Sequence, residues 1–101
     1  MSKIAERLAV EKTTHINIAY PIEGEIVSSP HYTFQIGTAP EAMRVAVSID
    51  GGEWQPCREA LGLWWHDWQD YQPGRHQIQV RIEKERGRME ISPIRRFLVQ
   101  F

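Results

Sequence analysis

Apolar side chains recur at every second position from residue 14 onward, in short runs that end at glycine or proline. The clearest run places four of them at alternate positions: Met43, Val45, Val47 and Ile49. A period of two sends alternate side chains to opposite faces of an extended strand. The pattern therefore predicts strands that each have one apolar face, and each such face must be buried against a second sheet.

Turn signals separate these runs about every 8–12 residues, which is typical of antiparallel sandwiches. Asp50, Gly51 and Gly52 predict a tight hairpin turn, and Pro73-Gly74 predicts another. Since no helical pattern follows residue 12, the predicted fold class is all-β. We expect an antiparallel immunoglobulin-like β-sandwich of about seven strands over residues 14–101, with a small closed barrel as the alternative. A chain of 101 residues is long enough for one modest core.

Residues 1–13 are expected to form an N-terminal arm or a short helix. Ile4 and Leu8 lie one helical turn apart, but isolated helices of this length are marginal in water, so both interpretations stay open. Charged residues interrupt every apolar run in this segment, so we expect no export signal and a cytoplasmic location. No run approaches the roughly 20 apolar residues of a membrane span.

Charge and residue spacing argue against several functional classes. The formal net charge of −1 argues against binding to nucleic acid or to a membrane surface. The four histidines and Cys57 show no spacing typical of metal ligands, and the serines have no nucleophile-elbow context. Cys57 has no neighbour that would activate it, so we expect a structural thiol. The sequence thus predicts no enzyme activity, no cofactor and no metal.

The aromatic residues are concentrated in one segment. All four tryptophans lie within residues 54–68: Trp54, Trp64, Trp65 and Trp68. Together with Tyr71 they represent on the order of 1,000 Å² of largely apolar surface, more than the roughly 300–600 Å² of the largest apolar patch on a typical monomer. We therefore expect one or two of the rings in the core, with Trp54 or Trp65 between the sheets.

The alternation within residues 61–71 suggests which rings remain outside. Leu61, Leu63 and Trp65 share one face, predicted to be the inner one. The opposite face would then present a binding surface made of Trp64, Trp68 and Tyr71, with His66, Asp67 and Asp70 as its polar rim and Trp54 nearby. Tryptophan and tyrosine are enriched at the energetic centres of protein interfaces, and their flat rings also stack on sugars. Packing of the rings against one another is a further possibility.

Residues 43–82 also resemble a known family. The string Val-Ala-Val-Ser-Ile-Asp-Gly-Gly-Glu-Trp-Gln at 45–55, then Trp68, then Gly-Arg-His-Gln-Ile-Gln-Val-Arg at 74–81, resembles the immunoglobulin-like (E-set or fibronectin-like) dimerisation domain of sulfite-oxidase-type molybdenum enzymes. The catalytic domain of those enzymes is absent, and their D-x-x-G-x-x-Q-P motif after Arg81 is not kept. The resemblance implies the same fold and a non-catalytic role.

Combining the residues with the resemblance, we expect a protein-interaction or assembly module. Its partner would be an unidentified protein or a second copy in a homodimer. The alternative is a carbohydrate-binding module that uses the aromatic surface as a platform.

Overall fold

The computed structural model describes residues 16–101, so the arm or short helix predicted over residues 1–13 lies outside the described residues. The described part consists of strands and one turn of 3-10 helix, which confirms the all-β class. One layer contains β1 (Ile16–Tyr20), β3 (His31–Thr38), β6 (Arg58–Ala60) and β7 (Leu63–Gln69). The other contains β2 (Glu25–Val27), β4 (Arg44–Ile49), β5 (Trp54–Pro56), β8 (Gly74–Glu83), β9 (Met89–Ile91) and β10 (Arg95–Val99), with the helical turn η1 (Glu85–Gly87) before β9.

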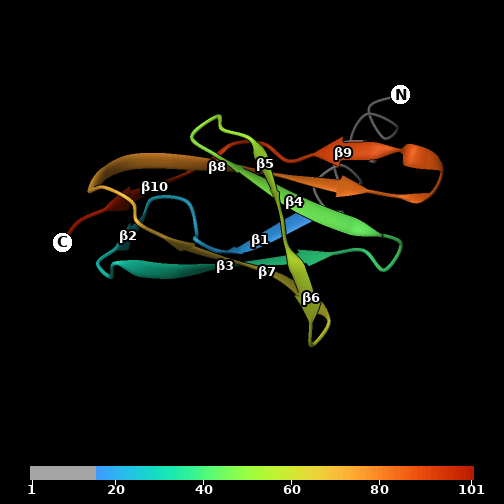
Figure 1. The fold of residues 1–101 in the computed structure, drawn as a ribbon, viewed down its shortest axis with the longest axis horizontal. Coiled ribbons are helices and arrows are strands. Elements are labelled where there is room, and N and C mark those ends of the chain that lie inside the picture. Colours follow the sequence, from blue (N-terminus) through green and yellow to red (C-terminus); the bar gives the residue numbers. More distant parts are fainter. Residues whose placement is uncertain (1–15) are drawn as a thin grey trace, which may run out of the picture.

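The two layers lie face to face as an immunoglobulin-like sandwich (Figure 1). The first sheet has the strand order β1-β3-β7-β6, and the second has the order β2-β10-β8-β4-β5, with β9 paired to β8. All pairs are antiparallel except β2, which runs parallel to β10. Each sheet of the described part ends in unpaired edge strands, so the closed-barrel alternative is wrong. Strands β2, β5, β6 and β9 have three residues each, too few for a period of two to reveal.

The core follows the predicted alternation closely. Its inward side chains come from every long strand, and they include Ile18, Phe34, Ile36, Val45, Val47, Ile78, Val80, Ile82, Phe97 and Val99. No buried side-chain nitrogen or oxygen of residues 16–101 lacks a hydrogen-bond partner. Burial of these apolar faces is the main stabilising contribution to the sandwich, and each fully buried side chain contributes about 1.5–3 kcal/mol.

Strand β7 has the predicted period but the opposite phase. Trp64 is 8% exposed and belongs to the core, whereas Trp65 faces outward; the prediction that Trp65 or Trp54 is the inner ring and Trp64 an outer one is wrong. The register of β7 with β3 gives the reason, because Trp64 lies opposite Ile36. Residues directly opposite each other in an antiparallel pair share a face, and Ile36 is fully buried.

Two tight turns use residues with positive φ. In the predicted hairpin, Asp50 and Gly51 have φ of 53° and 75°, and the N–H of Gly52 donates to the carbonyl of Ile49 at 2.9 Å. The second turn lies where the sequence alternation placed Leu61 on one face with Leu63 and Trp65: Leu61 and Gly62 have φ of 56° and 77° and join β6 to β7. This hairpin projects below the body of the sandwich in Figure 1.

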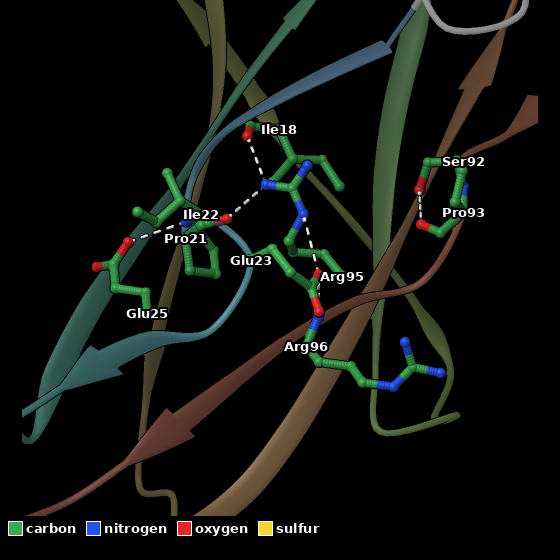
Figure 2. Close-up of polar contacts among 9 residues, drawn as sticks. All are labelled: Ile18, Pro21, Ile22, Glu23, Glu25, Ser92, Pro93, Arg95 and Arg96. Carbon is green, nitrogen blue, oxygen red and sulfur yellow. Dashed lines mark hydrogen bonds and ion pairs between the residues drawn. The ribbon is translucent and has the colours of Figure 1, made fainter.

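Between β1 and β2 the chain passes from the first sheet to the second, and the side chain of Arg95 forms hydrogen bonds with this connecting segment (Figure 2). Its Nη1 donates to the carbonyl oxygens of Ile18 at 2.9 Å and of Pro21 at 2.8 Å. Its Nε lies 3.7 Å from Oε1 of Glu23. Since Arg95 belongs to β10 of the second sheet, these contacts tie the edge of one layer to the other.

Candidate functional site

The sequence-predicted site is divided between the core and several surfaces. Trp64 is in the core, and Trp68 and Tyr71 are partly buried against it. His66 also points inward from β7, and its Nδ1 lies 3.1 Å from the carbonyl oxygen of Pro56. The open platform of Trp64, Trp68 and Tyr71 therefore does not exist in the described fold, because its three members face the interior.

Trp68 is the centre of an aromatic cluster at one end of the sandwich. It stacks on Tyr71 with the ring centroids 3.8 Å apart and lies 5.4 Å from Phe34 and 5.6 Å from Phe97. The hydroxyl of Tyr71 donates to the carbonyl of Ser29, and burial raises the pKa of Tyr71. Since each of the stacked rings covers a face of the other, this pair is not a free surface for a sugar ring. These residues match the packing interpretation.

His76 anchors the same cluster to the hairpin turn after β4. Its ring meets Trp68 edge to face at 5.1 Å. Nδ1 lies 2.7 Å from the carboxylate of Asp50, and Nε2 lies 2.7 Å from the carbonyl oxygen of Gln72. The other carboxylate oxygen of Asp50 accepts the backbone N–H of Gln77 at 2.9 Å. Both ring nitrogens face acceptors, so both hydrogen bonds form when each nitrogen carries a proton.

A group of neighbouring apolar side chains lies on the outer face of the first sheet. Leu63 and Trp65 point outward from β7, and Leu61 stands at the tip of the β6–β7 hairpin with 93% of its side chain exposed. The indole N–H of Trp65 donates to the carbonyl of Ala60 at 2.9 Å, which fixes the ring against the hairpin. We call Leu61, Leu63 and Trp65 the Trp65 face.

A hydrogen-bonded ion pair borders the Trp65 face. Arg58 of β6 donates from Nη1 to Oδ2 of Asp67 at 2.9 Å, and the hydroxyl of Thr33 donates to Oδ1 of Asp67, also at 2.9 Å. These two donors lower the pKa of Asp67, the Arg58 guanidinium first. Asp67 was predicted as part of a polar rim, and it lies beside a partly exposed aromatic ring, although that ring is Trp65 rather than Trp64.

The sequence contains a signal that separates the two faces of β7. Toward the end of β7 the odd-numbered positions are occupied by Asp67 and Gln69, whereas the even-numbered position 68 is occupied by tryptophan. Charged and amide side chains mark the solvent side of a half-buried strand. Leu61 does not follow this pattern, because it belongs to the turn before β7. Its apolar side chain at an odd-numbered position nevertheless favoured the wrong prediction that the odd-numbered side chains face the core.

The remaining predicted residues lie elsewhere. Asp70 is exposed at the end of β7 with a φ of 62°. Trp54 is on the outer face of the second sheet, where the Arg81 guanidinium lies 4.7 Å from the centroid of its ring. The structure therefore does not bring Trp54 or Asp70 together with the rest of the predicted site.

Two of the chemistries considered from the sequence, metal binding and a reactive thiol, can be compared with the described residues. Across residues 16–101, no three His, Cys, Asp or Glu side chains cluster closely enough to hold a metal ion. Burial raises the pKa of the Cys57 thiol to about 12, as expected for a structural cysteine. In the same part of the chain, no helix has the length and apolar character required to cross a membrane.

Comparisons with known proteins add information on the fold. No family model matches the sequence, and no curated protein matches it either. Among solved structures, the chain is similar to the fibronectin(III)-like modules of CbhA from Clostridium thermocellum, with 15% identity and a TM-score of 0.70 over 83% of this chain and 93% of that one. It is also similar to an engineered protein, with 17% identity and a TM-score of 0.69 over 85% of this chain but only 20% of that one.

These likenesses show a fibronectin-like, immunoglobulin-like β-sandwich, as the sequence predicted. At this level of identity they extend to the fold alone. The narrower resemblance to the dimerisation domain of sulfite-oxidase-type enzymes stays a prediction.

Proposed function

We propose that this domain is a non-catalytic assembly module that binds a second copy of itself through the Trp65 face. The observation that carries the proposal is Leu61, which is 93% exposed while its backbone takes a φ of 56°. A left-handed backbone costs a non-glycine residue about 1–2 kcal/mol. An exposed leucine also gives up the roughly 1.5–3 kcal/mol that burial would contribute. The isolated fold gains nothing from leucine here, whereas an interface would.

The composition of the Trp65 face supports contact with protein. Tryptophan and arginine are enriched at the energetic centres of interfaces, where a polar rim surrounds an apolar middle. Trp65 and Leu63 supply the middle, and the Arg58–Asp67 pair supplies the rim. The fixed indole of Trp65 loses little conformational freedom on binding, because its N–H is already bonded to Ala60.

The charge of this surface favours a second copy as the partner. A two-fold interface places the same surface patch of two subunits in contact, so a patch with a large net charge would repel the identical patch of the second subunit. The ion pair that borders the Trp65 face combines one cation, Arg58, with one anion, Asp67, and therefore adds no net charge. The resemblance of residues 43–82 to a dimerisation domain predicts the same kind of partner. A patch with three apolar side chains is smaller than the roughly 800 Å² per partner of a standard interface, so we expect weak association.

The states of the Cys57, His66 and His76 side chains support a non-catalytic role. The pKa of Cys57 is raised to about 12, so its thiol is protonated and a poor nucleophile near neutral pH. The inward ring of His66 and the anchored ring of His76 are both engaged in hydrogen bonds and aromatic packing.

Sedimentation equilibrium tests the proposal directly. Measurements from about 10 μM to about 1 mM cover the range of a weak dimer. We expect the average mass to rise toward the dimer with concentration, and Trp65→Ser and Leu61→Ser to abolish the rise. Trp54→Ser is the matched control, because it removes the same ring from the outer face of the opposite sheet and should leave association unchanged.

Two results would overturn the proposal. One is a wild-type chain that stays monomeric over the whole concentration range. The other is an equal loss of association in Trp54→Ser and Trp65→Ser, which would place the contact elsewhere. Far-ultraviolet circular dichroism of each variant confirms that the sandwich is intact.

A further inference from the structure

A second surface differs from the Trp65 face in position and chemistry. The outer face of the second sheet displays four arginines from adjacent strands: Arg44 of β4, Arg75 and Arg81 of β8, and Arg96 of β10. The carboxylates of Glu83, Asp50 and Glu23 lie beside them. Four cations therefore gather on one face of a chain whose formal charge is −1.

Two of these arginines have intramolecular contacts. Arg44 pairs with Glu83 at 3.3 Å, and the Arg81 guanidinium lies over the ring of Trp54 at 4.7 Å. The contact with Trp54 holds Arg81 in place while the edge of its guanidinium stays available for hydrogen bonds.

Arg75 and Arg96 are different, because within residues 16–101 their side chains have no hydrogen bond or ion pair. Figure 2 shows the side chain of Arg96 extending away from Glu23, whose carboxylate binds the backbone N–H of Arg96 instead. The carboxylate of Asp50 is bound on its other side, where Oδ2 lies 2.7 Å from Nδ1 of His76 and Oδ1 accepts the backbone N–H of Gln77.

Arg75 and Arg96 border an open depression with a volume of about 760 Å³, which Asp50, Gln77 and Leu98 also line. Arg96 lies opposite Gln77 in the β8–β10 register, and Arg75 is two residues from Gln77 on the same strand. The two arginines are therefore diagonal neighbours, about 7–8 Å apart at the backbone. Long side chains at that separation can direct two guanidinium groups at one carboxylate, and such charge-assisted pairs are strong when bidentate.

We propose that this depression and the outer surface of β8 beyond it bind an acidic segment of a partner protein, with Arg75 and Arg96 holding one carboxylate in the depression and Arg81, outside it, a second. Arg81 lies four residues beyond Gln77 on β8, a distance of about 13 Å along a strand. An extended peptide that runs along β8 would span this distance with acidic residues about four positions apart. Leu98, beside Arg75, and the exposed Ile26 opposite Leu98 would contact apolar side chains of the same peptide.

The surface favours a peptide over nucleic acid. Proteins that bind single strands stack bases on free aromatic rings. The aromatic ring on this face belongs to Trp54, and the Arg81 guanidinium lies over it. The overall charge of −1 also disfavours a long polyanion, whereas two or three carboxylates can be matched locally by Arg75, Arg81 and Arg96. The site is independent of the Trp65 face, which lies on the other sheet.

Fluorescence anisotropy tests this proposal with a rhodamine-labelled decapeptide that has two glutamates four positions apart. The peptide with glutamine at both positions is the ligand control. We expect the Arg75→Gln, Arg96→Gln double variant to weaken binding about tenfold or more, since hydrogen bonds between charged groups contribute substantially. The matched protein control is Arg86→Gln, Arg88→Gln, which removes the same charge at η1 and should change affinity less than about twofold.

Three outcomes would overturn the proposal. The first is no measurable binding of the glutamate peptide at low salt. The second is an equal loss of affinity in the two double variants, which would indicate general electrostatic attraction. The third is binding of a sulfated oligosaccharide or a single-stranded oligonucleotide through Arg75 and Arg96 that is tighter than binding of the peptide.

Discussion

Trp68 and Tyr71 lie ring on ring, with centroids 3.8 Å apart and planes at 12°, where the chain leaves β7 for β8. This stack separates the aromatic segment into two parts with different roles. Rings at even positions of β7 join the core and its end cluster, and the ring at the odd position 65 faces solvent. Tryptophans three residues apart in sequence should therefore respond to mutation in different ways.

The first prediction compares Trp68 with Trp65. Trp68→Ala removes a ring that packs against Phe34, Phe97 and Tyr71, so we expect the free energy of unfolding to fall by about 3–5 kcal/mol. Trp65→Ala removes an outer ring and should cost about 1 kcal/mol, mainly through the lost hydrogen bond to Ala60. Urea denaturation followed by circular dichroism measures both. Equal costs would contradict the division of the strand into a core side and a surface side.

Much of the sandwich could be predicted because its long strands are half-buried. In β4 and β8 the apolar positions alternate with polar ones, and the glycines after Asp50 mark the hairpin, so these elements follow from local sequence. The three-residue strand β5 could be expected only as the return strand of that hairpin, and β6 could not be predicted in this way. They extend over too few residues to show a period, and pairing with β4 and β7 defines them.

The candidate site was harder to predict for a physical reason. Both faces of β7 contain tryptophan, so hydrophobicity alone does not distinguish the inner side from the outer one. The register against Phe34 and Ile36 determines the orientation, and that pairing joins residues about 30 positions apart in the sequence. The apolar side chain of Leu61 added to the ambiguity, because it belongs to a turn with positive φ where glycine or asparagine is usual.

A second prediction concerns this turn. Leu61→Asn replaces a residue strained at a φ of 56° with one that tolerates the left-handed region, and the lost side chain is 93% exposed. We expect the free energy of unfolding to rise by about 1 kcal/mol, which corresponds to about 4–8 °C in Tm for a domain of this size. The same variant should lose self-association. A destabilised variant would show that leucine at this turn serves the fold itself, and a stabilised variant that still dimerises would show that Leu61 is not part of the interface.

A third prediction concerns the pH dependence of stability through Cys57. Burial raises the pKa of this thiol from its ordinary value near 9 to about 12. Between these values the thiol ionises in the unfolded chain but not in the folded one, so the free energy of unfolding should decline as pH rises above 9. Cys57→Ala should show a shallower decline than the wild-type chain between pH 9 and 10. At pH 8, iodoacetamide should label the unfolded chain much faster than the folded one, and equal rates would contradict a buried thiol.

The final prediction concerns the contact between Arg95 and the crossing from β1 to β2. Arg95→Leu keeps the aliphatic contacts but removes both hydrogen bonds to the carbonyls of Ile18 and Pro21, so we expect a loss of about 2–4 kcal/mol in the free energy of unfolding. Arg95→Lys should recover part of this loss, because an ammonium group can reach one carbonyl but lacks the planar fork. Arg96→Leu is the matched control: its side chain points to the outer face, and the substitution should change stability by less than about 0.5 kcal/mol. If the two leucine variants have equal stability, the two sheets are held together at this edge by apolar packing alone.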